Sequence, residues 1–111
     1  MKIVIPWLKM NYPIDIIHKI EIDFGNKAPE AFEIIEANFV SIVNYNDQRA
    51  IRCILFLVEK DLDKLKHFIK AAAADPRDVI LWAEYANRGQ GEQVIRLRDF
   101  NKPFEQADIN I

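Results

Sequence analysis

The sequence is poor in the residues from which most enzyme sites are built. Its 111 residues include one cysteine, one serine, two histidines and no threonine. Ser41 lies in a predicted helix without the sharp glycine turn that exposes a hydrolase nucleophile. Cys53 cannot form an intramolecular disulfide, and its apolar neighbours predict a buried thiol in a reducing compartment. Serine and cysteine nucleophile chemistry is therefore not indicated.

Metal-binding and cofactor-binding motifs are also lacking. His18, Cys53 and His67 have none of the short spacings that bring zinc ligands together. Of the three glycines, Gly89 and Gly91 follow a predicted helix, whereas a phosphate-binding glycine loop leads from a strand into a helix. We therefore predict no metal and no cofactor, and the sequence leans against an enzyme.

No uncharged apolar stretch is long. The longest, residues 53–58, is far below the ~20 residues that a membrane-spanning helix needs. The apolar run in residues 1–8 is interrupted by Pro6 and followed by Lys9, before a signal-peptide core could form. We therefore expect a soluble, cytoplasmic protein with no membrane partner.

Basic residues are not in excess over the whole chain, but the two signs of charge are unevenly distributed. The formal net charge is −2, from 15 basic and 17 acidic side chains. Residues 1–48 carry −3, residues 49–102 carry +3, and the remaining tail carries −2. A nucleic-acid-binding protein normally has a basic excess for phosphate contact, so no nucleic-acid partner is expected.

Helical periodicity dominates the rest of the sequence. Apolar spacing predicts helices at about residues 13–21, 29–44, 47–59, 61–74 and 75–85. Two of these have a strand as a rival. Residues 20–24 alternate as a strand would, and the third segment is apolar enough to be a buried strand, although its length favours a helix.

The fifth predicted helix has the clearest start signal. Asp75 can cap it, and Pro76 fits the first helical position, where its missing N–H costs nothing. The residues that follow are apolar around nearly the whole circumference, which is typical of a helix buried in the middle of a domain. We therefore expect the third and fifth helices inside, with Trp82, like Trp7, in the core.

The predicted fold is mainly α, a single domain over residues 1–111 with four or five helices and short extended arms at both ends. Residues 93–99 alternate in polarity, as a strand or an extended arm would. An α+β fold, with a small sheet built from the terminal arms, is the alternative. The arginines of the C-terminal arm are expected to pair with the glutamates of the second helix, Glu30, Glu33 and Glu36.

The functional prediction is a non-catalytic protein-binding module of inhibitor or immunity type. Its acidic half would cover a basic surface on another protein, and the predicted partner-binding residues are Glu30, Glu33, Glu36, Arg77 and Glu84. The alternative is a small-molecule binder or small enzyme with a pocket near the fifth helix and the C-terminal arm. Self-association as a homo-oligomer is a third possibility, because the third and fifth helices are rich in apolar residues.

Overall fold

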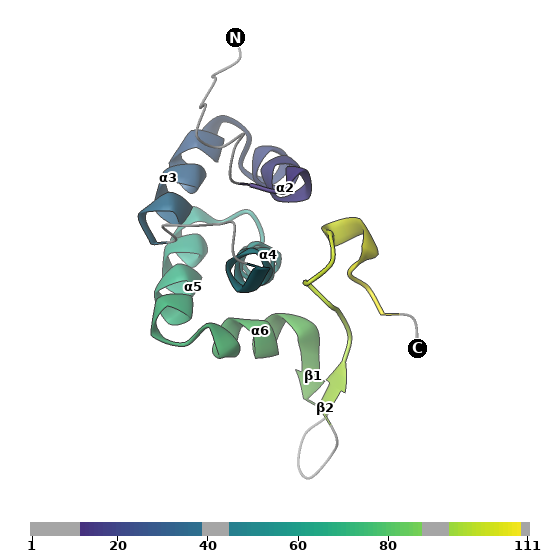
Figure 1. Ribbon diagram of the computed structural model, residues 1–111. Coiled ribbons are helices and arrows are strands. Elements are labelled where there is room, and N and C mark those ends of the chain that lie inside the picture. Colours follow the sequence, from purple (N-terminus) through teal and green to yellow (C-terminus); the bar gives the residue numbers. More distant parts are fainter. Residues whose placement is uncertain (1–11, 39–44, 88–93, 110–111) are drawn as a thin grey trace.

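The computed structural model describes residues 12–38, 45–87 and 94–109 (Figure 1). Within them, the chain forms five α-helices and two short strands. The helices are α2 (Ile14–Phe24), α3 (Ala28–Asn38), α4 (Tyr45–Val58), α5 (Leu62–Ala74) and α6 (Pro76–Glu84). The 3-10 helix η1 (Gly25–Lys27) joins α2 to α3. A second 3-10 helix, η2 (Phe104–Gln106), lies in the C-terminal arm. The prediction of a mainly helical fold is confirmed.

The strands β1 (Tyr85–Asn87) and β2 (Val94–Arg96) form a small antiparallel sheet, with Tyr85 opposite Arg96. β1 follows α6 directly, and β2 begins the C-terminal arm. Of the two structures considered for residues 93–99, a strand or an extended arm, a strand is observed over Val94–Arg96. Its partner is β1, directly after α6, whereas the predicted N-terminal arm lies outside the described residues.

α4 is the central helix of the fold. It packs against α2, α5 and α6, and every residue from 50 to 55 is buried. Cys53 is fully buried on this helix, as predicted. Length was the right criterion for this segment, because fourteen residues framed by polar ends suit a helix better than a strand.

Side-chain caps define the starts of α5 and α6. The Asp61 carboxylate accepts hydrogen bonds from the backbone N–H groups of Asp63 and Lys64 at 2.8 and 3.3 Å. The Asp75 carboxylate accepts one from the backbone N–H of Arg77 at 3.0 Å, with Pro76 at the first helical position. Both caps satisfy donors that a helix start leaves without partners, and the Asp75 cap was predicted.

Two details of the first two predicted helices differ in the structure. α2 runs on to Phe24, so the strand considered for residues 20–24 is wrong. Its buried stripe is Ile16, Ile20 and Phe24, whereas Ile14 is exposed. α3 is observed to Asn38, and residues 39–44 of the predicted helix lie outside the described residues.

The prediction that α6 is buried all round is wrong. Val79, Ala83 and Glu84 are buried, but Leu81 and Trp82 are 49% and 48% exposed. α6 lies at one edge of the molecule (Figure 1), packed against α4 and α5 on one side. An apolar circumference therefore did not make this helix central, because no described element covers its outer face. Trp82 is accordingly not a core residue, and Trp7 lies outside the described residues.

Candidate functional site

Glu84, at the end of α6, is the centre of a buried charge cluster. Its side chain is 0% exposed, and Arg49 of α4 donates to both of its oxygens, from Nε to Oε2 at 2.9 Å and from Nη2 to Oε1 at 2.6 Å. Arg96 of β2 donates to Oε1 at 3.0 Å, and the backbone N–H of Phe100 donates to Oε2 at 2.9 Å. The cluster therefore joins α4, α6 and the C-terminal arm.

A second buried pair fixes the arm to α4 about one turn further along the same side of the helix. Asp15 of α2 accepts from Arg52 of α4, at 2.8 Å from Nε and 3.0 Å from Nη2. Arg52 Nη1 also donates to the Phe100 carbonyl at 3.1 Å, and the Phe104 backbone N–H donates to Asp15 at 3.3 Å. Two carboxylates, Glu84 and Asp15, and one arginine, Arg52, thus bind the backbone of the arm at Phe100 and Phe104.

Arg98 adds a third attachment of the arm. Its guanidinium lies 4.2 Å from the centre of the Phe56 ring, and its Nη1 donates to the Ala83 carbonyl at 3.0 Å. The backbone N–H groups of Leu97 and Arg98 both donate to the Glu84 carbonyl, at 2.7 and 3.2 Å. The arm is therefore part of the packed fold, and its charged residues support it.

Burial and charge shift the titration of groups in this region. The hydrogen bond to Glu84 raises the pKa of Arg49. Burial, followed by the nearby negative charge of Glu84, raises the pKa of the Cys53 thiol well above its ordinary value. A thiol held in its protonated form is a poor nucleophile, since the thiolate is the reactive species. Cys53 is therefore buried in the core and is also a poor nucleophile.

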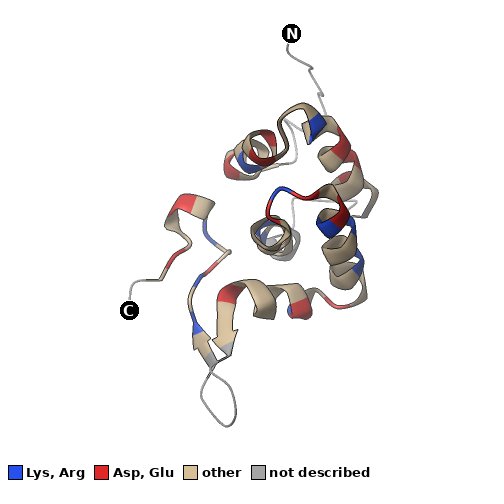
Figure 2. Cartoon of the chain, turned by 180° about the vertical axis from the view of Figure 1, so that it is seen from behind, with Lys and Arg blue, Asp and Glu red and all other residues tan. Residues whose placement is uncertain are grey.

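The three predicted glutamates are placed together on α3, and Figure 2 shows acidic positions along this helix. Glu30 and Glu33 are exposed, and neither has an ion-pair partner among the described residues. Glu36 is partly buried and accepts a hydrogen bond from the Tyr12 hydroxyl at 2.7 Å. Glu30 and Glu33 are thus available to a partner, while Glu36 has a structural contact.

Arg77 and Glu84 are not brought together, although both were predicted as partner-binding residues. Arg77 is at the start of α6, exposed, and bound to Asp75 with 2.8 Å between Nη2 and Oδ2. Glu84 is seven residues further along the helix, about 10 Å along its axis. Because Glu84 is buried and both its oxygens accept hydrogen bonds within the chain, we correct its assignment from the partner surface to the fold.

The predicted pairing of the arm with the α3 glutamates is also wrong for the arginines that the structure describes. Arg96 pairs with Glu84 and with Asp99, at 3.0 and 2.9 Å. Arg98 lies 3.8 Å from Asp108. The acidic groups for these arginines come from α6 and from the arm itself, so Glu30 and Glu33 stay exposed to solvent.

Sequence reasoning missed the exposed apolar residues of α2. Ile14 and Ile22 are 66% and 76% exposed, and His18 lies between them at the same four-residue spacing. The spacing puts all three on one side of the helix, away from the buried stripe. A signal was present in the sequence, because Ile22 stands between Glu21 and Asp23 and off the spacing of Ile16, Ile20 and Phe24.

Comparison of the chain with protein-family models, curated proteins and solved structures gave no match. Across residues 12–38, 45–87 and 94–109, no three His, Cys, Asp or Glu side chains lie close enough to hold a metal ion. In the same part of the chain, none of the helices has the length and apolar character needed to cross a bilayer.

Proposed function

We propose that this chain is a non-catalytic protein-binding module that covers a basic surface of another protein, as an inhibitor or immunity protein does. The observation that carries the proposal is the acidic face of α3, which we define as Glu30 and Glu33. α3 has three acidic residues and neither lysine nor arginine within its bounds. A partner rich in lysine and arginine would meet a complementary potential there.

The acidic face has little to contribute to the fold itself. Glu30 lies in the first turn, where a negative charge favours the helix dipole, but Glu33 is a turn further on. Like charges three residues apart on one helix repel each other by a few tenths of a kcal/mol. Since neither forms an ion pair within the described residues, a bound partner with basic side chains would offset this repulsion.

The exposed side of α2 supplies the apolar component that an interface also needs. α2 packs against α3, and only the three residues of η1 separate the two helices in sequence. Ile22, near the end of α2, therefore belongs to the same end of this hairpin as Glu30, near the start of α3. An apolar centre with a charged rim is the usual anatomy of a protein interface.

The buried carboxylates are hydrogen-bonded within the chain, which favours a binding role over catalysis. Glu84 and Asp15 have their carboxylate oxygens bound to arginines and to backbone N–H groups of the arm. A catalytic acid or base needs a proton-transfer position that a substrate can reach. The carboxylates left facing solvent, such as Glu30 and Glu33, are suited to rim contacts with another protein.

Affinity capture from cells of the source organism tests the proposal. The wild-type chain should retain a protein with a basic surface, and Glu33→Lys should lose it, because the substitution reverses one of the two charges of the acidic face. Added salt should weaken the capture, since exposed charge pairs are screened within a Debye length of about 8 Å at physiological ionic strength.

Asp78→Lys is the matched control. Asp78 is also an exposed helix carboxylate, so the substitution changes the net charge by the same amount. It lies on α6, which is separated from α3 by α5 (Figure 1). Asp78→Lys should capture the partner as well as the wild type does. Failure of the wild type to retain any protein, or equal loss in both variants, would be evidence against the acidic face.

A further inference from the structure

We propose that the chain forms a homodimer through the outer face of α5 and α6, with a second copy of itself as the occupant. This face is defined by Phe68, Leu81 and Trp82, and it is distinct from the acidic face of α3. The proposal adds an assembly to the chain and does not depend on the proposed function.

The centre of the face is an ordered apolar surface across two helices. The Phe68 and Trp82 rings meet edge to face, with 6.0 Å between their centroids, and His67 meets Phe68 in the same way at 5.2 Å. Trp82 is 48% exposed and the adjacent Leu81 is 49% exposed. The contact with Phe68 holds the indole in place, so little side-chain entropy remains to be lost when a partner covers it.

The area of this centre sets the expected strength of association. A large aromatic side chain buries roughly 150–250 Å², so a half-exposed tryptophan offers roughly 100 Å². Leu81, which is 49% exposed, extends this surface along α6. A surface of this size falls at the low end of interface sizes, so we expect a weak dimer.

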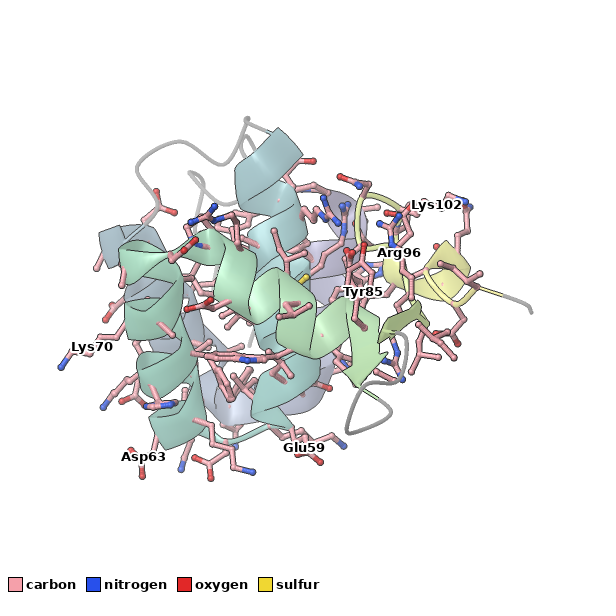
Figure 3. The ribbon with its side chains drawn as sticks, turned by 90° about the horizontal axis from the view of Figure 1, so that it is seen from below. Glu59, Asp63, Lys70, Tyr85, Arg96 and Lys102 are labelled. Atoms are coloured by element: carbon pink, nitrogen blue, oxygen red, sulfur yellow. The ribbon has the colours of Figure 1, made fainter. Side chains whose placement is uncertain are left out.

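The mixed charge around this face favours a second copy of the chain over a strongly charged partner. Residues 59–78 contain five basic and five acidic side chains, so this segment is neutral. Figure 3 views the molecule from this side and shows Glu59, Asp63 and Lys70 pointing outward, with both signs present. A two-fold axis brings a surface against itself, so a face of one sign repels its copy, whereas a face of mixed sign can pair with it.

The mixed charges also lie where they can form a rim. On α6, Asp78 is exposed one turn before Trp82. On α5, the side chain of Lys64 is 52% exposed one turn before Phe68, with its ammonium 3.8 Å from Glu59. Across a two-fold axis, Asp78 of one copy can therefore pair with Lys64 of the other copy. A partner with an entirely acidic or entirely basic surface would pair with charges of only one sign on this face.

Sedimentation equilibrium of the purified full chain, from about 1 μM to about 1 mM, tests the dimer over the affinity range expected of small interfaces. The wild type should pass from monomer to dimer. Leu81→Glu should weaken the association at least tenfold, since it puts a charge at the centre of the face. Ile22→Glu is the matched control, since Ile22 is an exposed apolar helix residue on α2 and its substitution makes the same chemical change.

Thermal unfolding of both variants verifies that they are folded, and Leu81 is exposed enough for its substitution to be tolerated. A second measurement is independent of substitutions in the face. In a Trp7→Phe background, Trp82 is the single tryptophan, and its emission should shift to the blue as concentration rises. A wild type that stays monomeric to about 1 mM, or equal weakening by Leu81→Glu and Ile22→Glu, would overturn the proposal.

Discussion

Arg49 holds both carboxylate oxygens of Glu84, from Nε at 2.9 Å and Nη2 at 2.6 Å, across 35 positions of sequence. The geometry is the fork-to-fork pairing that an arginine makes with a carboxylate. Arg96 and the Phe100 N–H complete the environment of the carboxylate. One side chain at the end of α6 thus decides how α4, α6 and the C-terminal arm fit together.

Glu84→Gln should reduce the free energy of unfolding by about 3 kcal/mol. The amide keeps the shape of the side chain but cannot accept from two guanidinium groups at both positions. The loss falls at the low end for a broken buried pair, because the Arg49 and Arg96 side chains are 22% and 34% exposed and can reach water. Urea unfolding measures it, and Glu33→Gln, an exposed control on α3, should stay within about 0.5 kcal/mol of wild type.

Asp15→Asn should cost about 3–5 kcal/mol, because it leaves the Arg52 guanidinium charged and without its carboxylate. The Arg52 and Asp15 side chains are 6% and 10% exposed, so solvent screens this pair little. The arm should loosen at the same time, since the Phe104 N–H donates to Asp15. Hydrogen exchange should show faster exchange of the Phe104 amide; an unchanged amide would mean that Asp15 does not hold the arm.

Stability should fall on the alkaline side. Burial raises the pKa of Cys53 and of Tyr12, and the hydrogen bond to Glu36 contributes at Tyr12. The ordinary values are 9.0 and 10.0, and below them both groups keep their protons folded or unfolded. Above them the unfolded chain releases protons that the folded chain retains, so unfolding becomes easier by up to ~1.4 kcal/mol per pH unit for each group.

Urea unfolding between pH 7 and pH 11 measures this loss and separates the two groups. Tyr12→Phe should flatten the decline above an ordinary tyrosine pKa of 10.0. Cys53→Ala should remove the part that begins near 9.0, although the small cavity it leaves lowers stability at every pH. A wild-type curve that is flat over this range would contradict the burial of both groups.

The start of α6 depends on the Asp75 side chain more than on Arg77. Asp75→Ala should lower the melting temperature, because the Arg77 backbone N–H loses its acceptor, whereas Asp75→Ser should retain most of the cap. Arg77→Ala should leave the melting temperature nearly unchanged, since the Arg77 side chain is 86% exposed and its ion pair is screened by water. A large loss with Arg77→Ala would show a contact beyond Asp75.

Local features of this fold could be read from the sequence. The caps at Asp61 and Asp75 depend on neighbours within three residues, and the apolar stripe of α5 repeats at helical spacing. The Asp75 cap and a helix at about residues 61–74 were predicted correctly. The length of the α4 segment distinguished a helix from a strand, and length is a property of the segment alone.

The charge clusters could not be read in the same way. Glu84 is 35 positions from Arg49 and 12 from Arg96, and Asp15 is 37 from Arg52, so no spacing rule connects them. The burial of α6 was predicted wrongly for a related reason. An apolar circumference shows which side chains a helix could bury. Which of them are buried depends on the elements that pack against the helix, and no described element packs against the outer side of α6.

The central claim is a division of the acidic residues into those that hold the fold, such as Glu84, and those that bind a partner, such as Glu33. Isothermal titration calorimetry of the captured partner against wild type, Glu33→Lys and Glu84→Gln tests it most directly. Below the melting temperature of every variant, Glu33→Lys should weaken binding at least tenfold, about 1.4 kcal/mol, while Glu84→Gln binds as wild type does. Wild-type affinity in Glu33→Lys, or equal losses in the two variants, would contradict the account.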